Sequence, residues 1–289
     1  MLKYKKSTIN FTISLILALL LLSCAALEEF AKISKPTLNI QKVRFSGMTF
    51  DKLDMVFDIK IHNPNPLSIK LAGLDYDLKI NNTSFLQGNK ENQLVIEANG
   101  ESKIEIPLSL GFKDIYNTFQ TLKNQDSSQY NIITRLYFDL PILGRTPLTI
   151  SKSGNIPLIK LPKIKVASLK LKHIGLSGAN LELKLGLTNP NSFNLLLKQL
   201  NYNFSINGKN WANGKLQQQL NLKGKKDAGL VIPISLDFFK MGQTVYSLLQ
   251  GDKNLNYQFN SDLDIKTSVP LIGEVKIPIA KSGTISIIK

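Results

Sequence analysis

The chain repeats one pattern of residues, and this repetition limits its folds more than any other feature. The segment that runs into Asn63-Pro64-Asn65 is matched 126 residues later by the segment that runs into Asn189-Pro190-Asn191. Near the end of each copy, Pro141-Ile142-Leu143-Gly144 is matched 129 residues later by Pro270-Leu271-Ile272-Gly273. The difference of three residues indicates one short loop insertion. Self-similarity of this kind predicts two copies of one fold.

Proline marks the start of each copy, because Pro36 and Pro162 stand at corresponding positions. We therefore predict a first domain at residues 36–158 and a second domain at residues 162–289. A tether, residues 24–35, precedes the first domain, and a signal peptide, residues 1–23, precedes the tether.

Each copy alternates apolar and polar residues with a period of two, which is typical of half-buried strands. In one strand the apolar positions alternate from Met55 to Ile61, and Asp58 is expected on the solvated face. One segment in each copy has helical spacing instead. Its apolar residues are Phe112, Ile115, Phe119 and Leu122 in the first copy and Phe238, Met241, Val245 and Leu248 in the second. The predicted fold class is mostly β, with two tandem antiparallel β-sandwich domains that each contain one α-helix.

The N-terminus has the pattern of an export signal. A lysine-rich stub precedes an apolar run that is shorter than the roughly 20 residues of a membrane-spanning helix. The run ends in Leu21-Leu22-Ser23-Cys24, which resembles the lipobox of bacterial lipoproteins. In that class the bond before the cysteine is cut and the cysteine is lipidated. We therefore expect cleavage between Ser23 and Cys24 and acylation of Cys24; the alternative is an uncleaved signal anchor.

The expected location is the cell envelope, with the acyl groups on Cys24 in a membrane. Cys24 is the only cysteine, so an intramolecular disulfide is excluded. Ala25 differs from the aspartate that resembles an inner-membrane retention signal. We therefore expect the outer membrane, on its periplasmic or surface face, if the source is Gram-negative.

The ordered pattern around the two Asn-Pro-Asn motifs resembles the late embryogenesis abundant type 2 family, also called the water stress and hypersensitive response (WHy) domain. An alternating strand runs into Asn-Pro-Asn, and a strand with Leu74-Asp75-Tyr76 or Leu200-Asn201-Tyr202 follows. The resemblance implies an immunoglobulin-like sandwich with one helix, and an association with desiccation. Because proline ends a strand and asparagine closes turns, we interpret Asn63, Pro64 and Asn65 as architecture, and likewise Asn189, Pro190 and Asn191.

The sequence contains no recognisable catalytic or metal-binding pattern. His62 and His173 are the only histidines, and neither has a histidine at the matching position of the other copy. Nucleotide-binding and nucleophile motifs are absent from the sequence. The net charge is +15, but arginine occurs only at Arg44, Arg135 and Arg145, which argues against nucleic acid as a partner. We predict a non-enzyme without a cofactor or a metal.

Three functions are consistent with the sequence. The first is a stress-protective lipoprotein that acts on client proteins or membranes. The second is a module that binds lipid or another hydrophobic ligand in a groove between sheet and helix. The third is a structural or adhesive surface lipoprotein. The groove would be lined by Phe112, Ile115, Phe119, Phe238, Met241 and Val245, whereas in a compact core these side chains would be covered.

Overall fold

The computed structural model describes residues 33–217, 219–250 and 254–288. The expected signal peptide, the cleavage position between Ser23 and Cys24, and most of the tether lie outside the described residues. Contacts between residues divide the chain into two compact units. The first contains residues up to Ser46, Asp54–Ser109 and Ser127–Pro157, and the second contains Gly47–Leu53, Leu110–Asp126 and Leu158–Lys289. Segments 47–53 and 110–126 thus group with the later chain, and the domain limits 36–158 and 162–289 stay predictions.

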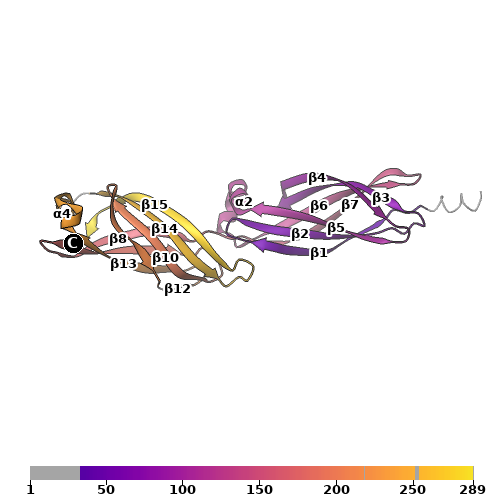
Figure 1. Cartoon of the computed structure of the whole chain (residues 1–289). Coiled ribbons are helices and arrows are strands. Elements are labelled where there is room, and N and C mark those ends of the chain that lie inside the picture. The colour runs from indigo at the N-terminus through magenta and orange to yellow at the C-terminus, as the bar shows by residue number, and fades with distance from the viewer. Residues whose placement is uncertain (1–32, 218, 251–253, 289) are drawn as a thin grey trace, which may run out of the picture. The chain divides into compact units, whose positions relative to one another are not determined.

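The first repeat forms two sheets, with strand orders β1-β2-β5 and β4-β3-β6-β7 (Figure 1). Its elements are β1 (Thr37–Met48), β2 (Lys52–His62), β3 (Ile69–Ile80), β4 (Thr83–Ile96), β5 (Glu101–Gly111), α2 (Phe112–Thr118), the 3-10 helix η1 (Gln120–Asn124), β6 (Ser127–Leu140) and β7 (Gly144–Pro157). Neighbouring strands of the second sheet are antiparallel. Short turns therefore connect β3 to β4 and β6 to β7.

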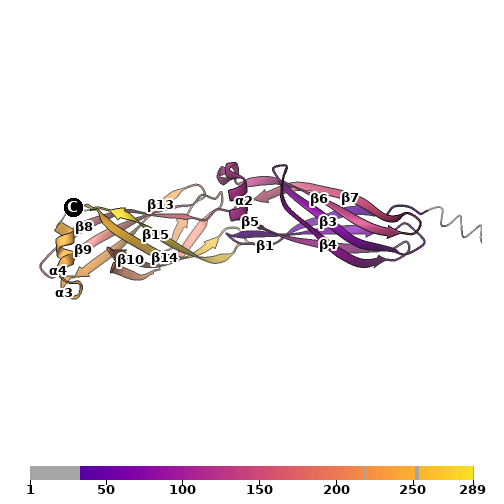
Figure 2. The ribbon, with the colours of Figure 1, turned by 90° about the horizontal axis from the view of Figure 1, so that it is seen from above.

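The equivalent strands of the second repeat have the same order, with a short strand added at the edge of one sheet. Figure 2 shows this repeat from above. Its elements are β8 (Lys163–Ile174), β9 (Gly178–Thr188), β10 (Leu195–Ile206), β11 (Lys209–Leu216), β12 (Leu220–Leu222), β13 (Asp227–Asp237), α3 (Phe238–Met241), α4 (Gln243–Gln250), β14 (Leu255–Thr267), β15 (Glu274–Ile285) and β16 (Ile287–Ile288). The sheets are β13-β9-β8-β16 and β11-β10-β14-β15, with β12 also beside β10. The short β16 pairs with β8 in parallel, and the pairings of β8 with β9, β9 with β13, β10 with β11, β12 and β14, and β14 with β15 are antiparallel.

The core of each repeat lies between its two sheets, as the period of two predicts. Alternate side chains of β2, from Met55 to Ile61, are fully buried, as are Leu183 and Leu185 of β9. The Phe57 ring of β2 meets the Tyr130 ring of β6 edge-on, with centroids 5.9 Å apart. These contacts join the two sheets of the first repeat, and the predicted fold class is confirmed.

The predicted helix is shorter than expected in both repeats. In the first, α2 ends before Phe119, whose φ of −121° is not helical, and η1 follows. In the second, α3 and α4 are separated by Gly242, whose φ is +84°. Helical spacing of apolar residues continues across both breaks, because each short segment still presents one face to the core.

Candidate functional site

The Asn63 side chain is fully buried directly after β2, where it binds the backbone of two loops. Its Nδ2 donates to the carbonyl oxygens of Leu67, Ile96 and Glu97, at 2.8, 3.2 and 2.9 Å. Its Oδ1 accepts from the backbone N–H and from the Nδ2 of Asn65, at 3.1 and 2.8 Å. Because the position needs both donors and an acceptor, an amide side chain suits it and a carboxylate or an apolar group does not.

Asn65 connects the motif to the chain that enters the repeat. Its Oδ1 accepts from the backbone N–H of Ser34 at 2.7 Å, and its Nδ2 donates to the Ser34 carbonyl at 2.9 Å. This pair of bonds resembles the pairing between two strands. We call Asn63, Asn65 and Ser34 the first clamp. It fixes the point at which the chain reaches the first repeat.

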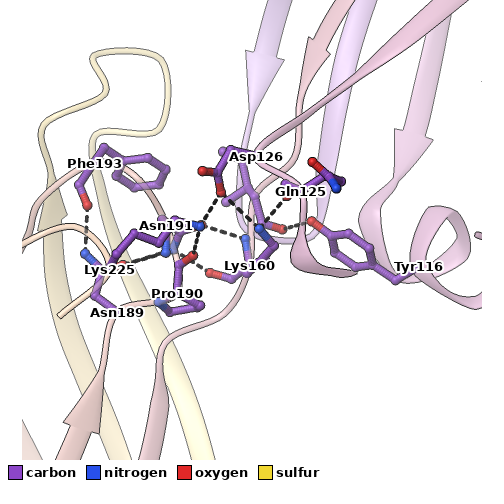
Figure 3. Close-up of polar contacts among 10 residues, drawn as sticks. Tyr116, Gln125, Asp126, Lys160, Asn189, Pro190, Asn191, Phe193 and Lys225 are labelled. Atoms are coloured by element: carbon purple, nitrogen blue, oxygen red, sulfur yellow. Dashed lines mark hydrogen bonds and ion pairs between the residues drawn. The ribbon is translucent and has the colours of Figure 1, made fainter. Parts of the chain in front are cut away.

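The second repeat builds the same clamp with Asn189, Asn191 and Lys160 (Figure 3). The Asn189 Nδ2 donates to the Phe193 carbonyl at 2.7 Å. Asn191 accepts from the Lys160 N–H at 2.8 Å and donates to the Lys160 carbonyl at 2.7 Å. The asparagines stand out in the sequence pattern, but their partners do not. Ser34 and Lys160 could not be predicted as partners, because almost any residue type supplies a backbone N–H and carbonyl.

Asp126 contacts two lysines beside the second clamp, within the second unit (Figure 3). The Nζ atoms of Lys160 and Lys225 both bind Asp126, and they also donate to the carbonyl oxygens of Gln125 and Pro190, respectively. Partial burial disfavours the charged form of Asp126, but hydrogen bonds from Lys225 and Lys160 outweigh burial and lower the pKa of its carboxyl. The carboxylate is therefore ionised at neutral pH, and two lysines pair its charge at the surface.

Asp58 is buried in an ion-pair network, whereas the sequence predicts a solvated side chain there. Arg44 of β1 binds both of its carboxylate oxygens, at 2.9 and 3.0 Å, and Lys103 of β5 contacts it at 3.4 Å. The hydrogen bond from Arg44 lowers the pKa of Asp58 in spite of the opposing effect of burial. The prediction of a solvated Asp58 was wrong because Arg44 lies on another strand. The alternation of residues within one strand does not show which residues of a neighbouring strand lie beside it. Lys184 occupies the matching position of the second repeat, so the network is not a repeated site.

Most of the proposed groove residues are covered. Phe112, Ile115, Phe238 and Val245 are at most 9% exposed, and Phe119 and Met241 are half-buried. The four buried side chains thus favour a compact core over an open groove.

The second unit contains a hollow of about 730 Å³ beside α2. Phe112, Tyr116, Ile159 and Leu161 contribute to its walls, so only one of the six groove residues lines it. The Tyr116 hydroxyl donates to the Ile159 carbonyl at 2.9 Å. Burial, assisted by the charge of Asp126, raises the pKa of Tyr116 to about 12, so the hydroxyl remains a donor at neutral pH.

No cluster of three or more histidine, cysteine or acidic residues suited to a metal occurs in the described part of the chain. Within those same residues, no helix combines the length and the hydropathy that a membrane crossing requires. Cys24 lies outside that part, so acylation stays a prediction.

The fold and the clamps together define a class, a tandem β-sandwich protein whose repeated motif binds its own backbone. A family model described as Late embryogenesis abundant protein (LEA_2) matches residues 58–154 and 184–283. The chain belongs to this family, and both repeats carry the match.

Individual relatives are similar to about half of the chain. A desiccation-related protein of Arabidopsis thaliana is 23% identical over 138 residues, which are 48% of this chain and 81% of the relative. Late embryogenesis abundant protein Lea14-A of Gossypium hirsutum is 24% identical over 129 residues, which are 45% and 83% of the two chains. The solution structure of a late embryogenesis abundant protein has a TM-score of 0.37 and 24% identity, and the similarity covers 52% of this chain and 87% of that one.

Proposed function

We propose that this protein is a lipid-anchored, non-catalytic member of the late embryogenesis abundant family that protects neighbouring proteins or membranes when water is lost. The observation that carries the proposal is the family match to both repeats. A relative that is described as desiccation-related supports the same role.

The clamps give a physical basis for protection. Loops usually depend on water for part of their backbone hydrogen bonding. Here the loops after β2 and β9 bind the amides of Asn63 and Asn189, which are fully buried. Bonds within the protein persist when water is withdrawn. A fold secured in this way stays ordered during drying and separates labile neighbours from one another.

The direct test is a drying assay. The mature chain is mixed with lactate dehydrogenase, a labile test enzyme, and the mixture is dried and rehydrated. Recovered enzyme activity is compared with that obtained with an equal mass of serum albumin. We expect the mature chain to preserve more activity than albumin. If recovered enzyme activity is no higher than with albumin, the proposed protective role is wrong.

The proposed anchor has its own test. The full chain and a Cys24→Ser variant are expressed in a bacterium, and the membranes are separated from the soluble fraction. We expect the unaltered chain in the membrane fraction, with an N-terminal peptide that begins at Cys24 and carries the mass of the acyl groups. An uncleaved N-terminus would support the signal-anchor alternative.

A hydrophobic ligand is the second candidate, and the hollow beside Phe112 and Tyr116 is the observation that favours it. Its volume lies within the range of about 300–1,000 Å³ that small-molecule sites occupy. Native mass spectrometry of the unacylated chain, purified without detergent, distinguishes the two roles. A fatty acid or phospholipid at a fixed ratio would favour ligand binding, and bare polypeptide would favour protection.

A further inference from the structure

The turn between β6 and β7 carries two exposed apolar side chains. Ile142 is 73% exposed and Leu143 is 51% exposed. At the matching turn of the second repeat, Leu271 is 46% exposed but Ile272 is buried. Hairpin turns ordinarily place glycine, asparagine or aspartate at such positions. We call residues 141–144 the β6–β7 tip. The turn of the second repeat has the same four residue types, so the exposure of both apolar side chains, and not the composition, distinguishes the first repeat from the second.

Ile142 also has a backbone conformation that its side chain disfavours. Its φ is +67°, and the Leu143 N–H donates to the Pro141 carbonyl at 2.7 Å, which closes a strained γ-turn. Most other non-glycine residues with positive φ in the described chain are asparagines, which tolerate this conformation. A β-branched residue with such a φ is an outlier, and outliers of this kind concentrate at functional positions.

The β6–β7 tip lies at the end of the first repeat where the chain enters (Figure 1). Lys70, at the start of β3, is paired with Asp139 near the end of β6, so the tip is beside the loop that contains Asn65. Asn65 holds Ser34 in the first clamp. Ser34 is ten residues after Cys24, and ten extended residues span at most about 35 Å.

The charged groups near the tip suit an anionic surface. Arg145 follows the tip, and its guanidinium lies over the ring of Tyr137, 5.1 Å from the centroid. Arg145 and Lys70 stand on either side of Asp139 in the register of β7, β6 and β3. The three neighbouring side chains Arg145, Asp139 and Lys70 therefore carry one net positive charge. Basic and aromatic side chains beside apolar ones are typical of the interface between water and phospholipid.

We propose that the β6–β7 tip inserts Ile142 and Leu143 into the phospholipid bilayer to which the chain is attached. The proposal rests on the membrane anchoring proposed above, which keeps the tip near the lipid. Two side chains bury little apolar area, but a short tether raises their effective concentration at the surface, so a weak contact is sufficient. The positive φ of Ile142 holds both side chains away from the sheet and towards the bilayer.

The test replaces the acyl group with an artificial anchor. A chain of residues 25–289 keeps every described residue, and an N-terminal hexahistidine tag attaches it to vesicles of phosphatidylethanolamine, phosphatidylglycerol and a nickel-chelating lipid. Leu143→Trp reports on the tip, and Leu271→Trp, at the exposed apolar position in the turn of the second repeat, is the control. The native Trp211 is 4% exposed and contributes a constant background. Brominated lipids quench only tryptophan that reaches the acyl chains.

We expect attachment to shift the emission of the Leu143→Trp variant to shorter wavelength and brominated lipid to quench it, with no such change for Leu271→Trp. Adding Ile142→Asn to Leu143→Trp is expected to reduce the quenching. Unchanged emission of Leu143→Trp on attachment, or equal quenching at both turns, would overturn the proposal. Because the tag replaces the acyl group, this result is independent of the acylation of Cys24, which the mass of the N-terminal peptide tests separately.

Discussion

At the scale of single residues, the two clamps account for the Asn-Pro-Asn motif. In both repeats one asparagine secures the loops and the other holds the chain as it enters. Their partners are almost entirely backbone groups, so each asparagine is defined by hydrogen-bonding geometry and not by the neighbouring side chains. The motif therefore stabilises the fold, and its buried asparagines do not themselves bind a partner at the surface.

Removing the first clamp amide is expected to destabilise the fold strongly. Asn63→Ala leaves the buried carbonyl of Ile96 and its neighbours without their donor, which should lower the free energy of unfolding by about 3 kcal/mol. Asn189→Ala should act similarly in the second repeat. Asn213→Ala, at an exposed asparagine, is the control and should change stability by less than about 0.5 kcal/mol. Denaturant unfolding measures all three, and an Asn63→Ala effect as small as the control would contradict the clamp.

The ion pair between Asp58 and Arg44 predicts a dependence of stability on pH. Because the folded-state pKa of Asp58 is lowered, its contribution to stability is complete above the ordinary aspartate pKa of about 3.9 and is lost as pH falls through the folded value. The Asp58→Asn variant should therefore melt at a lower temperature than the unaltered chain at pH 7. The difference between the two melting temperatures should disappear below about pH 4. Thermal unfolding across this pH range checks the prediction, and a difference in melting temperature that does not change with pH would contradict it.

At the scale of secondary-structure elements, the strands could be predicted from the sequence and the helix breaks could not. The period of two in β2 follows directly from residues that face a core on one side. In the second repeat, Phe238, Met241 and Val245 keep a helical spacing, so the pattern continues through Gly242, where the helix is interrupted. The burial of Asp58 depends on pairing between strands, which a single strand's pattern does not contain.

Gly242 allows the interruption between α3 and α4. Its φ of +84° and ψ of 159° lie in a region that is essentially restricted to glycine. Gly242→Ala is expected to lower the free energy of unfolding by about 1–3 kcal/mol. Gly175→Ala is the matched control, because an added Cβ there meets nothing closer than 3.6 Å. Equal melting temperatures for the two variants would contradict this explanation of the break.

The strain at the β6–β7 tip predicts a substitution that stabilises the protein. Ile142→Asn places a residue that tolerates positive φ in the turn and should raise the free energy of unfolding by about 1 kcal/mol. Leu271→Asn, at a turn residue whose φ is not positive, should give no comparable gain. Unfolding in denaturant distinguishes the two, and a loss of stability in Ile142→Asn would show that the turn is not strained.

At the scale of the whole molecule, duplication gives one chain two folded repeats of a family with desiccation-related members. The clamps recur in both repeats, whereas the Asp58 network and the turn with two exposed apolar side chains belong to the first. This asymmetry supports the proposals made above, in which the first repeat follows the lipid anchor in the chain and inserts its β6–β7 tip into the membrane.

The measurement that tests the central claim most directly is the drying assay with a clamp variant. The double variant Asn63→Ala and Asn189→Ala is compared with the unaltered chain at a temperature where only the unaltered chain is folded. If folded repeats protect, recovered lactate dehydrogenase activity should fall to the level obtained with albumin when the clamps are removed. Equal recovery with the unfolded variant would contradict the claim, because protection would then depend on the composition of the chain and not on its fold.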